Sequence, residues 1–540
     1  HLVPSWLAVI SKAIIAYSNN IDAYQCFSRF PEIFEIVGTY FKSDNENIRT
    51  SASQCLISIC VEGISDSLLL LPPKTKPEVY ENVDDIITKL SEITLSFLNI
   101  EFRNSAKDIC ELISTVIMKL RFRANPDFIP HIEVLGEWRS NEQDGFELNE
   151  VAETVISTAI SSLGPEVIVG TLPLNLDKPN AVGRAWLLPL LRDNIRNASL
   201  SFYIKSILPY TEFFESRIAN NKDPNSVHAK VFQTIVDQIW SLLPHFCDLP
   251  NDLQKSFTDE FAAKLSSLLY EKVELRGVIC HALKLLVESN VVYGEGALSE
   301  DVLMQQQFPE EEAKKNIDYI ATTKASKILS VLFNVFTQTP LDSRGFVLET
   351  IEAYLQISTP EDLGETFNKV CGILKKALED ENEGISRDEE ESGSKIPRLS
   401  VTMMDIVSSM AKYVPQSSHN ALFAIFNQTV KVNNGAIQKR SYRIVSRLLE
   451  TEEGVKSTLN FVSNITELLV STSEDSLLPA KASRLGLILE ILKNLPSDQL
   501  HFIPSILSEI IMSTKSVNEK TREESCLLYT SPSPRDSTSS

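Results

Sequence analysis

One amphipathic helical pattern recurs along this chain, and its recurrence restricts the fold more than any other feature of the sequence. In the first clear copy, Ile48, Ala52, Leu56 and Ile59 recur at the spacing that places apolar side chains on one face of a helix. Arg49 directly follows the first apolar position. The same arrangement returns over residues 102–113, 275–286, 437–448 and 480–491, and Lys520 begins a further copy. The chain therefore repeats one structural unit.

The spacing of the copies identifies the kind of repeat. The aligned positions Gln438, Lys481 and Arg522 lie 43 and 41 residues apart, and a period of about 40 to 47 residues belongs to two-helix repeats of the HEAT or armadillo kind. A second amphipathic segment precedes the pattern, as in residues 30–41 and 83–98. With only 18 glycines in 540 residues, the chain is poor in the residue that sharp turns and phosphate loops require. We therefore predict an all-α fold, a HEAT/armadillo-like α-solenoid of stacked helix pairs.

Two segments interrupt the predicted array. Residues 377–396 are rich in carboxylates and poor in apolar side chains, which is typical of a solvated, disordered loop. Residues 526–540 contain two prolines and a serine- and threonine-rich end, and they resemble translated library-adapter sequence. We expect helical repeats over 1–376 and 397–525, separated by the acidic disordered loop. We also expect 526–540 to be a non-native tail and the natural protein to continue.

The cysteines and the net charge limit the class of protein. Eight cysteines are scattered without a C-x-x-C pair or a zinc-type His and Cys set, so we interpret them as reduced core thiols of a cytosolic or nuclear protein. No stretch reaches the roughly 18 uncharged apolar residues of a membrane span. A net charge of −21 disfavours nonspecific coating of nucleic acid and favours basic partners. We expect no membrane contact.

The motifs that begin most enzyme sites are missing from the sequence. It contains no G-x-S-x-G, no G-x-x-x-x-G-K-[ST], no G-x-G-x-x-G and no H-E-x-x-H. Hydrolase, nucleotide-binding and metalloprotease interpretations therefore lack their starting residues. His245 and Cys247 lie close together without a second ligand pair, so we interpret both as structural. We expect no enzyme activity, no cofactor, no metal and no small-molecule substrate.

Arginines on the segment 437–448 form the first candidate contact surface. Arg440, Arg443 and Arg447 recur at helical spacing beside the apolar stripe of the same segment. Such solenoids commonly line their concave side with the second helix of each pair, where an arginine stripe could hold phosphates or an acidic peptide. Pairing of these arginines with carboxylates of neighbouring repeats is the alternative in a chain this acidic.

A second basic cluster surrounds Phe122. Lys119, Arg121 and Arg123 could stack RNA bases together with this ring. They also precede Asn125, where a helix is expected to end, and cations at the C-terminal end of a helix are favoured by its dipole. Both interpretations stay open.

Residues 183–193 form an apolar segment that charged side chains and a proline interrupt. It reads G-R-A-W-L-L-P-L-L-R-D. If Pro189 opens a helix, its missing N–H costs nothing there. Arg192 and Arg196 then project from the side of the apolar face, which consists of Leu191, Ile195, Ala198 and Phe202. We predict a joint between helices first and, through its arginines, a binding edge second.

Tryptophans mark this joint and a similar one. Trp186 precedes Pro189, and Trp240 precedes Pro244. We expect each indole ring to pack between helices. Together with Arg184, the arginines at 192 and 196 complete the set of candidate contacts at the first joint.

Five segments carry a resemblance to a known family. They read P-L-N-L (173–176), G-R-A-W-L-L-P-L-L-R-D (183–193), Q-I-W-S-L-L-P-H-F-C-D-L-P (238–250), S-V-L-F-N-V-F (330–336) and Q-K-R-S-Y-R (438–443). In this order they resemble the ribosomal RNA-processing protein 12 family, HEAT-repeat factors of eukaryotic ribosome biogenesis. The resemblance implies a non-catalytic nucleolar and nuclear protein, shuttling to the cytoplasm, that binds pre-ribosomal particles through pre-rRNA and basic ribosomal or assembly proteins. It also implies support of pre-rRNA maturation and subunit export, and a basic C-terminal region outside this chain.

Two other classes share the long acidic helical array. An importin-β-like nuclear transport receptor would bind basic cargo, nuclear transport factors and a Ran-type GTPase. A cytoplasmic HEAT scaffold that regulates an enzyme would bind a phosphatase or kinase. Composition does not separate these classes from the first.

Overall fold

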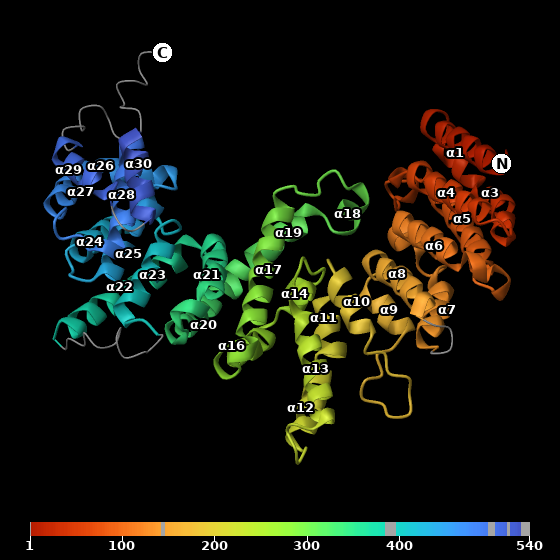
Figure 1. Ribbon diagram of the computed structural model, residues 1–540, viewed down its shortest axis with the longest axis horizontal. Coiled ribbons are helices and arrows are strands. Elements are labelled where there is room, and N and C mark those ends of the chain that lie inside the picture. Colours follow the sequence, from red (N-terminus) through yellow and green to blue (C-terminus); the bar gives the residue numbers. More distant parts are fainter. Residues whose placement is uncertain (1, 142–145, 384–395, 495–502, 516–518, 531–540) are drawn as a thin grey trace. The chain divides into compact units, whose positions relative to one another are not determined.

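Helices joined by turns make up the described part of the chain (Figure 1). The computed structural model describes residues 2–141, 146–383, 396–494, 503–515 and 519–530, and no strand occurs among them. The predicted all-α fold is confirmed for these residues. The chain divides into two compact units, unit 1 with His1–Phe261 and His281–Asn316, and unit 2 with Ala262–Cys280 and Ile317–Ser540.

Successive helices of unit 1 pack against one another in chain order. Helix α1 packs on α4, α4 on α6, α6 on α8, and α8 on α10, while α3 packs on α5 and α12 on α13. Each helix can bury its apolar stripe only against such neighbours, as expected for a repeat array. The bounds are α1 Leu2–Asn20, α2 Ala23–Ser28, α3 Phe30–Gly38, α4 Glu46–Gly63, α5 Pro77–Ser96, α6 Ala106–Leu120, α7 Ile129–Ser140, α8 Phe146–Leu163, α9 Pro165–Thr171, α10 Leu187–Asn194, α11 Leu200–Phe202, α12 Pro209–Ala219, α13 Val227–Ser241, α14 Leu243–Phe246, α15 Leu253–Ser256 and α18 Val302–Gln307.

Unit 2 continues the same packing rule. Helices α21, α23, α25, α28 and α30 pack in that order, and α22, α24 and α29 pack on α23, α25 and α30. The bounds are α20 Ala325–Gln338, α21 Gly345–Ile357, α22 Pro360–Glu383, α23 Leu399–Met410, α24 His419–Thr429, α25 Gly435–Leu448, α26 Glu452–Asn460, α27 Val462–Ser471, α28 Leu478–Asn494, α29 Ile503–Ser513 and α30 Glu519–Thr530. Three helices have residues in both units, namely α16 Asp259–Glu271, α17 Arg276–Gly294 and α19 Glu310–Thr323.

Asparagine caps begin two of the repeated helices. The Asn45 side chain accepts a hydrogen bond from the Asn47 amide at 2.9 Å, and Asn434 accepts one from the Ile437 amide at 3.1 Å. Such caps satisfy amides that have no partner within the helix. The predicted segments 437–448 and 480–491 lie within α25 and α28.

Two other copies begin as tighter turns. Residues Ile100–Ser105 and Val273–Leu275 form 3₁₀ turns ahead of α6 and α17, so Arg103 precedes its α-helix and Arg276 is the first residue of one. The sequence pattern does not distinguish the two helix types, because one turn of either places residues three apart on one side.

The joint at Pro189 differs from its prediction. Helix α10 begins at Leu187, so Pro189 is its third residue, where the amide would still lack a partner within the helix. The helix ends at Asn194. Ile195 and Ala198 are buried as expected, but they lie in the turn after the helix and not on its face.

Two predicted boundaries also move. Helix α22 continues to Glu383, because Ala377 is buried and Glu381 accepts hydrogen bonds from the Ser400 amide and hydroxyl at the start of α23. The first residues of the predicted acidic loop are therefore helical, and 384–395 lie outside the described residues. Helix α30 continues to Thr530, with Leu528 buried, so the first residues assigned to the tail are helical as well. Residues 531–540 lie outside the described residues.

Long helices in this fold are amphipathic. Among the described residues, none of the helices combines the length and the apolar character needed to span a membrane.

Candidate functional site

Helix α25 carries the arginine stripe, and its first arginine is used inside the protein. The Arg440 side chain is buried, with Nε 2.6 Å from Oδ1 of Asp405 on α23. Its Nη1 donates to the Ala436 carbonyl at 3.0 Å. This arginine joins two neighbouring repeats, as the pairing alternative predicts.

Arg447, one end of the stripe, is also paired. Its Nη2 donates to Glu352 on α21, and its Nη1 lies 3.8 Å from Glu450. The side chain is about one quarter exposed, at 27 %. Arg447 therefore connects α25 with α21, and its charge is largely compensated.

Arg443, between these two, is exposed and forms no ion pair with any described residue. Desolvation by the surrounding protein, followed by repulsion from Arg440, lowers the pKa of its guanidinium, and Asp405 opposes this shift. Because arginine remains charged even after such a shift, the position keeps a positive charge that no ion pair with a described residue holds in place.

Two lysines extend this basic region, because Lys439 interacts electrostatically with both Arg443 and Lys520. Desolvation, then repulsion from Arg443, Arg440 and Lys520, lowers the pKa of Lys439. Lys439 is half-buried on α25, whereas Lys520 is exposed at the start of α30. We call Lys439, Arg443 and Lys520 the α25 basic surface. An anion seated there would reduce the repulsion that, after desolvation, contributes to the lowered pKa of Lys439 and of Arg443.

A second buried arginine lies near Asp405 and Arg440. Arg344, the residue before α21, stacks over the Phe336 ring at 3.9 Å and donates to Thr402 Oγ1 at 2.8 Å. Its Nε and Nη1 have no hydrogen-bond partner. Burial lowers its pKa, while Asp405 raises it and Arg440 lowers it. Asp405 thus interacts electrostatically with two buried arginines, Arg344 and Arg440.

The three arginines of the Pro189 joint each have a different partner. Arg184 donates to the Pro173 carbonyl at 2.7 Å and so fixes the preceding loop. Arg192 pairs with its neighbour Asp193 at 3.0 Å, and Arg196 lies 3.5 Å from Asp248. Arg192 and Arg196 are exposed, as expected of a binding edge, but all three side chains already have partners.

The tryptophans at the two joints differ in burial. Trp240 is buried, with 4 % of its surface exposed, as predicted. Trp186 is only half-buried and lies beneath the Arg139 guanidinium, 4.9 Å from its ring. The difference arises because Trp186 precedes α10 as its capping residue, whereas Trp240 lies inside α13.

The second basic cluster does not form an exposed stacking surface. Arg123 is buried, pairs with Asp84 at 2.8 Å and stacks on Tyr80 at 4.2 Å. Arg121 pairs with Asp301 at 2.6 Å and lies 3.7 Å from Asp66. Both arginines are therefore structural, and the base-stacking interpretation of this cluster is wrong for them.

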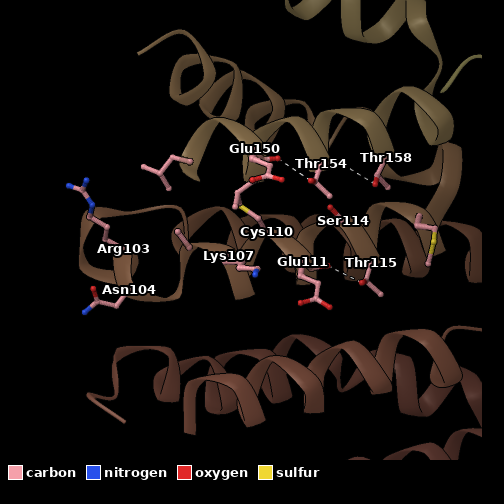
Figure 2. A pocket seen from close by; sticks show the side chains of 14 residues that line it. Arg103, Asn104, Lys107, Cys110, Glu111, Ser114, Thr115, Glu150, Thr154 and Thr158 are labelled. Atoms are coloured by element: carbon pink, nitrogen blue, oxygen red, sulfur yellow. Dashed lines mark hydrogen bonds between the residues drawn. The ribbon is translucent and has the colours of Figure 1, made fainter. Parts of the chain in front are cut away.

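A groove between α6 and α8 was not predicted from the sequence. Figure 2 shows its polar lining, with Arg103 and Lys107 towards one end and Ser114, Thr154 and Thr158 along its length. Its volume is about 1060 Å³. The periodic polar face of α6 could have indicated it, because the polar residues Lys107, Glu111, Ser114 and Thr115 of this helix all line the groove.

Grouped metal ligands and an ionised cysteine thiol in the α6–α8 groove would each indicate a reactive site. Within the described part of the chain, no three His, Cys, Asp or Glu side chains are grouped to hold a metal ion. Cys110 lines the α6–α8 groove, but burial raises the pKa of its thiol to about 12, which keeps it protonated and unreactive.

Comparison with known proteins identifies the array. Residues 42–339, more than half of the chain, match the family described as ribosomal RNA-processing protein 12, HEAT repeats. The chain belongs to the ribosomal RNA-processing protein 12 family. It is 44 % identical to ribosomal RNA-processing protein 12 of Saccharomyces cerevisiae over 97 % of this chain and 42 % of the relative. It is 25 % identical to the RRP12-like protein of Homo sapiens over 97 % of this chain and 38 % of the relative.

This membership confirms the resemblance drawn from the five segments. The chain spans less than half the length of these relatives of the ribosomal RNA-processing protein 12 family. Among solved structures, yeast importin-β (Kap95p) is similar at 9 % identity and a TM-score of 0.42, over 97 % of this chain and 71 % of that one. So weak a likeness carries no argument on function.

Proposed function

We propose that this chain is a non-catalytic HEAT-repeat scaffold of pre-ribosomal particles, which supports pre-rRNA processing, subunit maturation and nuclear export. Membership of the ribosomal RNA-processing protein 12 family supports a role in ribosome biogenesis. The α25 basic surface supports a contact with an anionic partner, because repulsion among its cations helps to lower the pKa of Arg443 and of Lys439 in a chain of net charge −21.

The α25 basic surface is proposed to contact phosphates of pre-rRNA. Phosphate contacts are made by lysine and arginine side chains and release counterions, so a few uncompensated cations are sufficient for a local contact. The paired Arg440 and Arg447 position the surface rather than bind. The joint arginines Arg184, Arg192 and Arg196 are assigned a secondary role at most, because each already has a partner.

The remaining acidic surface is proposed to face basic partners. Basic ribosomal or assembly proteins fit the net charge of −21. Location in the nucleolus and nucleus, shuttling to the cytoplasm, and contact with nuclear transport factors or a Ran-type GTPase during export rest on the family alone. No catalytic step is assigned to any residue.

Charge reversal on the α25 basic surface tests the proposal. The variant combines Lys439→Glu, Arg443→Glu and Lys520→Glu in the full natural protein. The matched control, Lys431→Glu with Lys456→Glu and Lys515→Glu, makes the same charge change at exposed lysines of the same unit. On sucrose gradients we expect the first variant to leave the pre-ribosomal fractions and the control to remain in them.

Direct binding gives a second measurement. For purified protein and single-stranded pre-rRNA fragments, three lost phosphate contacts should reduce the slope of log Kobs against log salt by about two. Equal binding and equal sedimentation of variant and control, with both proteins folded by circular dichroism, would remove the α25 basic surface from the proposal.

A further inference from the structure

A segment of unit 1 bridges repeats that are far apart in the sequence. Residues 295–308, which we call the strap, connect α17 to α19 and contain the short helix α18. The strap contacts Leu71, 235 residues away from Gln306, and Arg121, 180 residues away from Asp301. In a simple solenoid each repeat contacts only its neighbours. These contacts therefore add a link that the repeat architecture does not require.

The first link is a pair of hydrogen bonds to the backbone. The Leu71 amide donates to Oε1 of Gln306 at 2.8 Å, and Nε2 of Gln306 donates to the Leu71 carbonyl at 2.6 Å. One side-chain amide thus satisfies both polar groups of a single residue, which is the geometry of a specific contact and not of chance proximity.

The second link is the ion pair at Arg121. Its Nη1 lies 2.6 Å from Oδ1 of Asp301 on the strap, and its Nη2 lies 3.7 Å from Asp66. The Arg121 backbone has φ of +52° and ψ of −134°. A non-glycine residue holds such a conformation only where its surroundings determine it, and here the guanidinium joins two carboxylates of different repeats.

The strap itself is held firmly on its own side. The Tyr293 hydroxyl donates to the Phe308 carbonyl, and Gln305 Nε2 donates to the Tyr293 hydroxyl at 3.0 Å and to the Leu298 carbonyl at 3.0 Å. Asp301 caps α18 by accepting from the Met304 amide at 3.1 Å. These hydrogen bonds tie the strap to Tyr293 near the end of α17.

The strap also forms one wall of a groove of about 740 Å³. Leu303, Met304 and Phe308 of the strap line this groove together with Met118 and Phe122. Opening the strap would therefore uncover apolar side chains and release Arg121 from Asp301.

We propose that the strap is a latch that holds the curvature of the N-terminal repeats. Closed, it ties the turn at Leu71 and the end of α6 to the α17–α19 connection. Opened, it lets these repeats move apart and uncovers the groove. This inference concerns the architecture of unit 1 and does not depend on the proposed ribosomal role.

Paired substitutions on the strap test the latch. Gln306→Ala removes both hydrogen bonds to Leu71. Asp301→Asn removes the charge partner of Arg121 while an asparagine can still cap α18. The control is Gln307→Ala, an exposed residue next to Gln306. Hydrogen exchange of the full chain, followed by mass spectrometry, reports on the peptide that contains residues 66–72.

Loss of the latch should accelerate hydrogen exchange in the peptide around Leu71. In the doubly substituted protein, exchange of peptide 66–72 should be at least about fivefold faster, as for the loss of one net hydrogen bond. Peptides of α4 should be unchanged, and Gln307→Ala should match the parent protein. Unchanged exchange at 66–72, or equal acceleration in the control, overturns the proposal.

The single variants distinguish loss of the latch from a general loss of stability. If the doubly substituted protein exchanges faster in every peptide, Asp301→Asn alone decides the question. Acceleration confined to the Leu71 region and the Arg121 end of α6 supports a latch, and its absence there overturns one.

Discussion

Arg440 and Arg443 lie one helical turn apart on α25, yet only Arg440 is buried and ion-paired, with its Nε 2.6 Å from Asp405 Oδ1. Arg440 fastens α25 to α23, whereas Arg443 projects from the same helix without a described carboxylate partner. Two arginines of one sequence pattern therefore perform different tasks, and substitutions separate these tasks.

Alanine at these two positions should affect stability very differently. Arg440→Ala leaves Asp405, whose side chain is only 13 % exposed, without its ion-pair partner, and breaking a buried pair costs about 3 to 5 kcal/mol. Arg443→Ala should change the free energy of unfolding by less than about 0.5 kcal/mol. Urea unfolding followed by circular dichroism measures both, and similar midpoints for the two variants would contradict the assignment.

The two tryptophans provide a second contrast in stability. Trp240→Ala should cost about 3 to 5 kcal/mol because the whole indole is buried. Trp186→Ala should cost only about 1 to 2 kcal/mol, since half-burial removes less apolar surface from water. This value for Trp186 replaces the larger one that full burial between helices would imply. The order of the unfolding midpoints checks the prediction, and it fails if Trp186→Ala is the more damaging change.

His131 should make unit 1 sensitive to acid. Burial lowers its pKa to about 4 from the ordinary value of 6.5, and its Nε2 lies 2.9 Å from Thr94 Oγ1. The unfolded chain binds the proton more readily, so stability is retained above about pH 6.5 and falls as the pH drops towards 4. A shift of this size corresponds to about 3 kcal/mol.

Melting temperatures between pH 4 and 7 test this dependence. The variant His131→Gln should show a weaker loss on the acid side, whereas His228→Gln, at an exposed histidine, should follow the parent protein. Identical pH profiles for all three proteins would count against His131 as the sensitive group.

Charge reversal at the Pro189 joint should leave the protein folded. Arg192→Glu and Arg196→Glu each replace an exposed arginine whose ion pair contributes little, typically below about 1 kcal/mol. Helical content by circular dichroism should therefore be unchanged. On a sucrose gradient, departure of the folded double variant from the pre-ribosomal fractions would assign this edge a binding role. Unchanged sedimentation would make it architecture alone.

Several features of the fold follow from the sequence because they depend on local spacing. The apolar positions at 437–448 specify one buried face of a helix whatever its neighbours are, and α25 has that face. The 43- and 41-residue spacing similarly indicates stacked helix pairs, since one pair cannot cover its own apolar surface. Boundaries were less accurate: the acidic composition at 377–383 suggested a loop, but burial of Ala377 and the contacts of Glu381 with Ser400 extend α22.

The use of each arginine, in contrast, depended on groups brought together by tertiary packing. No local pattern distinguishes Arg440 from Arg443, because the deciding carboxylate, Asp405, is on another helix. The sequence alone allowed Arg123 to stack on bases, but in the fold it pairs with Asp84 and stacks on Tyr80. The strap is the extreme case, since Gln306 meets Leu71 across 235 residues. Helical periodicity depends on residues a few positions apart, so the sequence alone determines it. Electrostatic pairing depends on distances between residues in space, which only the tertiary structure determines.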